Sequence, residues 1–150
     1  MTTTVNFNLS ATLQTTLTNA GTETYAYAFA FGAPTANGTV VLDSYVTLVD
    51  AGVVQTSPSL SLSSPGFYSG AIYVVIQQKG DGTLPTQITD IGDIATLSQS
   101  QNYSYQLFEM TLSGQQGDQG DISALNTFGF ASTLEVVYQS GSVTRGFNSS

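Results

Sequence analysis

The sequence predicts an all-β protein, a two-layer antiparallel β-sandwich that forms one domain over residues 1–150. Short segments of alternating apolar and polar residues, separated by clusters of Gly, Pro, Asn and Asp, recur along the chain. No segment shows a sustained helical period of 3.6 residues. With 150 residues, of which 41% are hydrophobic and 11% aromatic, the chain is large enough to bury one core.

The first two strands are predicted from period-2 alternation. Apolar residues alternate with Asn, Ser and Thr over residues 5–13, which predicts a strand with one solvated face. Residues 19–21 then turn the chain. Over residues 25–31, four aromatic rings alternate with alanines, so one face of this strand carries rings and the other carries only methyl groups. The small face permits close approach of another sheet or another chain.

Three more strands are expected in the middle of the chain, bounded by turns at residues 34–38 and 50–52. They are a strand at 39–49 with a bulge near Asp43, a short alternating run within 57–65, and a buried strand at 70–78 with a continuous apolar centre. In the segment that follows, residues 83–101, isoleucines and a leucine recur every third position. That spacing fits either a helical turn or a loop fixed to the core, and we expect irregular structure there.

The segment at residues 105–138 holds most of the candidate chemistry. It predicts a strand carrying Glu109, a glycine-rich acidic loop at 114–121, a short capped turn or helix beginning at Asp121 or Ser123, and a closing strand. The simplest role for Asp121 is to cap that turn. For Glu109, the alternative to a ligand contact is a solvent-facing or backbone-bonded acid in the middle of a strand.

Charge and composition exclude several classes of function. Ten acids against two bases, Lys79 and Arg145, give a net charge of −8, so neither nucleic acid nor an anionic membrane is an expected partner. The chain has no histidine and no cysteine, which removes imidazole and thiolate chemistry and disulfides. We expect no cofactor. Asp118 and Asp121 are the candidate calcium ligands. The loop acids do not fit the EF-hand spacing, and no metal is expected.

The first ten residues carry no basic segment and no long apolar run, so no signal peptide is predicted. No run of 18 apolar residues occurs either. The absence of cysteine does not decide the compartment.

Three stretches carry a resemblance to a known family: GAIYVVIQQKG, YQLFEMTLSG and DISALNTFGFASTLEVVY. Their order is similar to that of the sandwich domain of the laminaripentaose-producing β-1,3-glucanases, where strands like IYFSF and FEFT precede a segment like NISYVDFFSIPITL. More distantly, the chain resembles thaumatin-like proteins. The resemblance implies a thaumatin/glucanase-like sandwich and places Glu109 at the position of one catalytic acid. Asn126 stands where the family has an aspartate, and no counterpart of the family's second domain follows residue 138.

This departure from the family pattern favours a non-enzymatic protein. Ordinary glycoside hydrolysis needs two carboxyl groups, and an asparagine amide cannot take the proton. The alternative that stays open is that Asp118 or Asp121 supplies the missing carboxylate beside Glu109. A partner chain that completes the groove would also restore the enzymatic case.

The sequence most favours a self-associating structural subunit, a filament or sheath protein for example, whose partner is a homo-oligomer or polymer of the same chain. Only 8% of the residues are charged, and strand edges are normally guarded by charges, lysine above all. The first alternative is a non-catalytic β-1,3-glucan-binding protein with Glu109, Asn126, Asp121 and Tyr105 as ligand residues. The second alternative is a β-1,3-glucanase in which Glu109 is the residual catalytic candidate. Four tyrosines are candidates for a sugar-stacking platform, with core packing as the alternative: Tyr68, Tyr73, Tyr103 and Tyr105.

Overall fold

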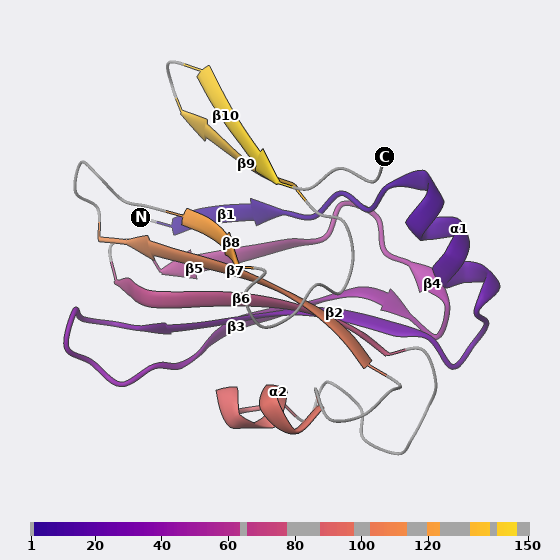
Figure 1. The fold of residues 1–150 in the computed structure, drawn as a ribbon, viewed down its shortest axis with the longest axis horizontal. Coiled ribbons are helices and arrows are strands. Elements are labelled where there is room, and N and C mark those ends of the chain that lie inside the picture. Colours follow the sequence, from indigo (N-terminus) through magenta and orange to yellow (C-terminus); the bar gives the residue numbers. More distant parts are fainter. Residues whose placement is uncertain are drawn as a thin grey trace.

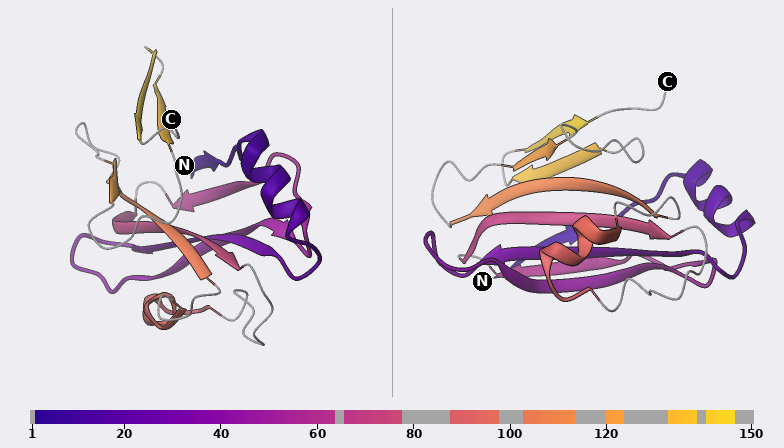
Figure 2. Two further views of the ribbon diagram at one scale, coloured as in Figure 1. Left: turned by 45° about the vertical axis from the view of Figure 1, so that its right-hand side comes forward. Right: turned by 60° about the horizontal axis from the view of Figure 1, so that its bottom comes forward.

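The protein is mostly antiparallel β-structure in the computed structural model, which describes residues 2–63, 66–77, 88–97, 103–113, 120–123, 133–138 and 141–146. A curled sheet has the strand order β4-β3-β2-β6-β7-β8, and two separate two-stranded sheets pair β1 with β5 and β9 with β10 (Figures 1 and 2). The strands are β1 (Thr2–Asn6), β2 (Tyr25–Ala33), β3 (Val41–Asp50), β4 (Val53–Val54), β5 (Ser59–Ser63), β6 (Phe67–Gln77), β7 (Tyr103–Leu112), β8 (Gly120–Ser123), β9 (Thr133–Tyr138) and β10 (Gly141–Gly146). The two helices are α1 (Ala11–Asn19) and α2 (Ile91–Leu97).

Both faces of the large sheet are apolar, and other elements pack against each of them. The alanine face of β2 packs in one core with Leu60 and Leu62 of β5 and Leu17 of α1. The aromatic face of β2 packs in a second core with Ile88 and Ile94, at and before α2. Figure 1 shows β1, β5 and α1 on one side of the sheet and α2 on the other. The alanines of β2 therefore do allow another sheet to approach closely, as the sequence predicted.

The N-terminal prediction is wrong beyond residue 6, because β1 ends at Asn6 and a helix begins at Ala11. Ser10 is the N-cap, and its hydroxyl oxygen accepts the backbone N–H of Leu13 at 3.2 Å. Leu9, Leu13 and Leu17 are spaced by four residues, a spacing that satisfies both a period of two and one face of a helix. The cap and the burial of Leu17 decide in favour of the helix.

The central strands agree with the prediction, including the bulge. The register of β3 against β2 passes from Ser44, opposite Ala30, to Leu42, opposite Phe31, so that Asp43 has no partner on β2. The Asp43 carboxylate turns to β5, where it accepts hydrogen bonds from the Ser63 hydroxyl at 2.9 Å and the Ser63 backbone N–H at 3.2 Å. The bulged residue thereby connects the β1–β5 sheet to the large sheet by hydrogen bonds.

Helix α2 is a second correction, since irregular structure was expected at residues 83–101. Two aspartates organise its start: the Asp93 carboxylate accepts the N–H groups of Thr89 and Asp90, each at 3.0 Å, and Asp90 accepts that of Gly92 at 2.7 Å. Seven residues form a helix too short to be stable by itself, so its packing on the sheet matters more than its propensity. Within the described residues, no helix is long and apolar enough to cross a membrane.

The largest fully buried side chains of the first core include Phe67, at the start of β6. Two glycines make room for its ring. A Cβ atom added at Gly32 or at Gly70 would collide with the ring of Phe67. These positions therefore need glycine for space rather than for a special backbone angle.

The end of the chain differs from the single closing strand that was expected. β9 falls within the expected segment, but it pairs with β10, which the sequence did not indicate. This hairpin lies beside β8 (Figure 1).

Candidate functional site

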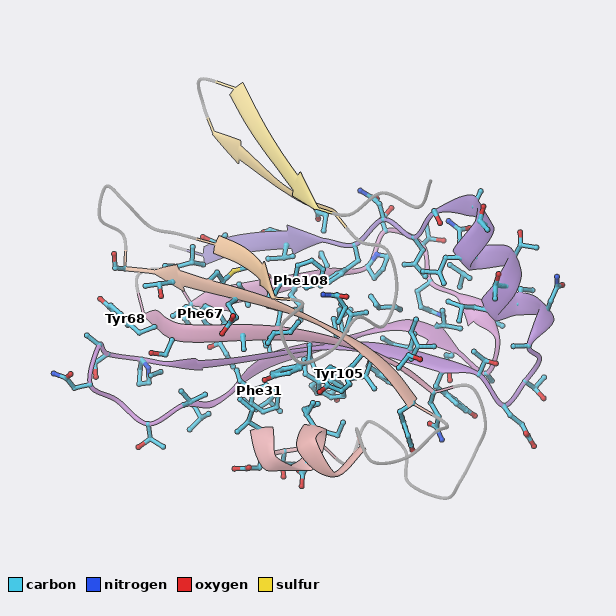
Figure 3. The ribbon with its side chains drawn as sticks, in the orientation of Figure 1. Phe31, Phe67, Tyr68, Tyr105 and Phe108 are labelled. Carbon is cyan, nitrogen blue, oxygen red and sulfur yellow. The ribbon has the colours of Figure 1, made fainter. Side chains whose placement is uncertain are left out.

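The candidate site lies on the face of the sheet that carries the aromatic rings. Along β7, Phe108, Met110 and Leu112 point into the first core, whereas Tyr103 and Tyr105 belong to the second. Because successive side chains of a strand point to opposite faces, Glu109 shares its face with the tyrosines. Its side chain is exposed. Figure 3 shows Tyr105 and Phe31 toward the α2 side of the sheet and Phe108 on the opposite side.

Tyr73 of β6 connects Glu109 with Tyr105. It is directly opposite Leu107 in the register of β6 with β7, so Tyr105 and Glu109 occupy its two diagonal positions. The rings of Tyr73 and Tyr105 have centroids 6.1 Å apart and are tilted by 53°. Both tyrosines are half-buried, so each residue keeps part of its surface accessible to solvent.

The ring pair at Tyr73 continues as an aromatic row across the sheet. Tyr73 meets Phe31 of β2 edge-on, at 6.1 Å between centroids and 77° between planes. Further along β2, Phe29 stacks on Tyr27 at 6.0 Å and on Tyr45 of β3 at 6.1 Å. Tyr45, at the outer end of this row, is 56% exposed. The row therefore extends over β3, β2, β6 and β7.

The packing of these groups changes the acidity of two tyrosines. Burial raises the pKa of the Tyr73 hydroxyl above its ordinary value of 10.0, with smaller contributions from Tyr105 and Glu109. Burial also raises the pKa of Tyr27, assisted by Asp50, Tyr25 and Tyr45. Both hydroxyls are thus held neutral in the folded protein, and they remain hydrogen-bond donors over a wider range of pH than a free tyrosine.

These raised pKa values predict a loss of stability in alkali. The unfolded chain releases the tyrosine protons first, so the free energy of unfolding is unaffected by them below pH 10.0 and falls as the pH rises through the folded-state pKa values. Urea unfolding measured on both sides of pH 10.0 should show this fall. Tyr73→Phe keeps the ring and should make the fall shallower. A fall as steep as that of the wild type in both Tyr73→Phe and Tyr27→Phe would contradict the assignment.

Strand β8 brings the backbone of a second acidic residue next to Glu109. Asp121 is directly opposite Glu109, and Ser123 is opposite Leu107, in the antiparallel pairing of β8 with β7. A capped turn or helix beginning at Asp121 is therefore wrong, because residues 121–123 belong to a strand. One beginning at Ser123 would lie in residues outside those that the structure describes. Asp and Ser are common at caps, but four residues that complete a ladder with β7 gain backbone hydrogen bonds that a lone cap does not supply.

Of the predicted ligand residues, Glu109 and Tyr105 lie on one face of the sheet, and Asp121 is opposite Glu109 in the strand register. Asn126 lies outside the described residues. So does Asp118, one of the two calcium candidates. The other two stacking candidates do not add exposed rings next to this pair. Tyr103 lies on the same face as Tyr105 but is buried in the second core, and Tyr68 lies near the start of β6 (Figure 3). Among the side chains that the structure describes, no three His, Cys, Asp or Glu residues are grouped to hold a metal ion.

Tyr45 and the phenylalanines of β2 were not singled out as part of a site in the sequence. The alternation of β2 predicts its aromatic face, but the rings join a row only through the registers of β2 with β3 and β6. Comparison of the chain with protein-family models, with curated proteins and with solved structures found no match. Function is therefore inferred from the site itself.

Proposed function

We propose that the protein binds a neutral carbohydrate, without cleaving it, on the face of the sheet formed by Tyr73, Tyr105 and Glu109. The observation that carries the proposal is the pair of half-buried tyrosine rings, 6.1 Å apart, on the same face as an exposed carboxylate. Aromatic rings pack against the apolar C–H faces of sugars, and a carboxylate accepts hydrogen bonds from their hydroxyl groups. The two kinds of group together are suited to a polyol with apolar faces.

The charge of the chain argues for a neutral ligand. With a net charge of −8 and only Lys79 and Arg145 as bases, the protein repels phosphorylated and carboxylated sugars. The resemblance of residues 105–114 to the glucanase motif that bears a catalytic acid adds a substrate class, β-1,3-glucan, with Glu109 as the residue that contacts it. In the same proposal, the β1–β5 sheet is the second layer of a thaumatin/glucanase-like sandwich.

Affinity for a soluble β-1,3-glucan tests this function. Glu109→Gln removes a charge-assisted hydrogen bond and should weaken binding about tenfold or more, since such bonds contribute about 1.5–3 kcal/mol. Tyr105→Ala removes one stacking ring and should weaken binding by a similar factor. Calorimetric titration with a β-1,3-glucan oligosaccharide measures both effects, with circular dichroism as a check of folding.

Two variants outside the site serve as matched controls. Glu23→Gln removes an exposed acid from the turn before β2, and Tyr68→Ala removes a half-buried tyrosine from the far end of β6. Neither should alter glucan affinity. If wild-type protein does not bind, or if Glu23→Gln and Glu109→Gln weaken binding equally, the proposal fails.

Hydrolysis of the same glycan is a second candidate, favoured by the pairing of Glu109 with Asp121. Residues directly opposite on antiparallel strands have Cβ atoms about 4.5–5.5 Å apart. Two carboxyl groups at such positions can approach the separation of about 5–5.5 Å that retaining glycosidases use. Incubation with the glucan distinguishes the two functions. Release of reducing ends that disappears in both Glu109→Gln and Asp121→Asn would replace binding with hydrolysis as the function.

A further inference from the structure

One contact of the aromatic row joins two tyrosines. Tyr73 and Tyr105 have ring centroids 6.1 Å apart, inside the range of about 4.5–7 Å for aromatic rings in contact. The other three contacts of the row each include Phe29 or Phe31. Because phenylalanine has no hydroxyl group, the Tyr73–Tyr105 contact is the one in the row that pairs two oxidisable phenols.

The position of the two rings suits a bond between them. They lie on diagonal positions of β6 and β7, which are within reach of aromatic side chains. Their planes are tilted by 53°, and two phenol rings joined by a single bond are likewise twisted rather than coplanar. The phenol of Tyr105 also contributes to the raised pKa of Tyr73, so the two hydroxyl groups lie within electrostatic range of each other. Phenol radicals couple at the ring carbons next to the hydroxyl-bearing carbon, and a change of side-chain angles is enough to bring these carbons together.

The composition of the chain directs one-electron oxidation to tyrosine. The sequence has eight tyrosines and two methionines, and it has no cysteine, tryptophan or histidine. Thiols and indoles are the side chains that compete with phenols for a one-electron oxidant, and this chain has neither. Methionine is oxidised differently, by taking up an oxygen atom.

We propose that Tyr73 and Tyr105 form a modification site at which a peroxide, acting through a one-electron carrier, joins the two rings as dityrosine. Each phenol gives one electron to the carrier and its hydroxyl proton to water. The two radicals form one carbon–carbon bond between ortho positions, and each ortho hydrogen then moves as a proton to the oxygen of its own ring. In total the pair loses two electrons and two protons, and hydrogen peroxide takes up both to become water.

The cross-link has the thermodynamic effect of a disulfide in a chain that has no cysteine. It connects β6 to β7 covalently and closes a loop over residues 73–105, which restricts the unfolded chain. This loop contains α2, whose seven residues depend on packing for their stability. The proposal does not rest on carbohydrate binding, although the same two rings serve both.

Photo-oxidation with ruthenium tris(bipyridine) and peroxydisulfate tests the site, on dilute protein and without glucan. Peroxydisulfate accepts two electrons and becomes two sulfate ions. Wild-type protein should acquire the blue fluorescence of dityrosine and still run as a monomer on a denaturing gel. Mass spectrometry of a peptic digest should find the segments that contain Tyr73 and Tyr105 joined, with the loss of two hydrogen atoms. The cross-linked protein should also unfold at a higher urea concentration than untreated protein.

Conservative variants make this test specific to the pair. Tyr73→Phe and Tyr105→Phe keep the ring and remove the hydroxyl, and each should lower the fluorescence of the monomer to that of protein oxidised in urea. Tyr45→Phe is the matched control, because Tyr45 is an exposed tyrosine that stacks on Phe29, and it should leave this fluorescence unchanged. Circular dichroism checks that each variant is folded.

Three results would overturn the proposal: no dityrosine in the wild-type monomer, dityrosine confined to a dimer band, or undiminished fluorescence in either Tyr73→Phe or Tyr105→Phe. Because every measurement is made without glucan, a failure of carbohydrate binding would leave these results unaffected.

Discussion

Phe67→Ala is expected to lower the free energy of unfolding by about 3–5 kcal/mol, the largest effect of any single change proposed for this chain. The Phe67 ring is fully buried in the first core and sits between Gly32 and Gly70. Glycines have no side chain that can move into the space a lost ring leaves. The cavity should therefore persist, and cavity volume adds to the lost transfer free energy. Urea unfolding followed by circular dichroism measures the loss.

Two controls separate this effect from the general cost of removing an aromatic ring. Phe67→Leu keeps most of the apolar volume and should cost clearly less than Phe67→Ala. Tyr45→Ala removes a ring that is 56% exposed but stacks on Phe29, and should cost no more than about 1.5 kcal/mol. If Phe67→Ala is no less stable than Tyr45→Ala, the Phe67 ring does not contribute to the stability of this core as proposed.

The strands with strong local patterns could be predicted from the sequence. The ring and alanine alternation of β2, the apolar centre of β6 and the position of the Asp43 bulge all follow from side-chain type at successive positions. Each of these patterns indicates which face of its own strand a side chain occupies. Local chemistry of this kind is present in the sequence before any tertiary contact forms.

Both helices were missed for the same reason: the spacing of their apolar residues is compatible with two kinds of structure. The leucines at 9, 13 and 17 fit a strand or a helix, and the isoleucines at 88, 91 and 94 fit a helix or a loop. In both cases a side-chain cap decides the outcome: the Ser10 hydroxyl at α1 and the carboxylates of Asp90 and Asp93 at α2. Capping residues are visible in the sequence, but Ser and Asp are equally common in turns.

The candidate site also combines features that the local sequence pattern predicts with features that depend on long-range strand pairing. Glu109 and Tyr105 could be selected from the sequence because both lie on one strand with an obvious alternation. Their connection through Tyr73, and the position of Asp121 opposite Glu109, depend on the registers of β6 and β8 with β7. Register is set by long-range pairing, and a shift of one residue would move Tyr73 to the other face of the sheet.

Gly70→Ala is expected to cost about 1–3 kcal/mol, the usual range for overpacking a core. A Cβ atom at this position would meet the Phe67 ring and would lie only 2.7 Å from the carbonyl oxygen of Met110 on β7. The ring can shift by rotating its side chain, but the carbonyl belongs to the backbone opposite Gly70 in the β6–β7 ladder. Relief therefore requires the two strands to separate locally. Urea unfolding should show the loss, and hydrogen exchange should be faster at the adjoining amides of β6 and β7.

A double-mutant cycle with Phe67→Leu divides the Gly70→Ala cost between its two causes. If the ring is the main obstacle, Gly70→Ala should cost clearly less in the Phe67→Leu background, giving a coupling of about 0.5 kcal/mol or more. If the Met110 carbonyl dominates, the two changes should be additive. Gly92→Ala, on α2, is the control. Its Cβ atom would lie 3.0 Å from Asp90 Oδ1, which belongs to an exposed, flexible side chain, while alanine is the better helix former, so the change in stability should stay within about 1 kcal/mol. Equal stability of Gly70→Ala and wild type would show that β6 and β7 do not approach as closely as this packing requires.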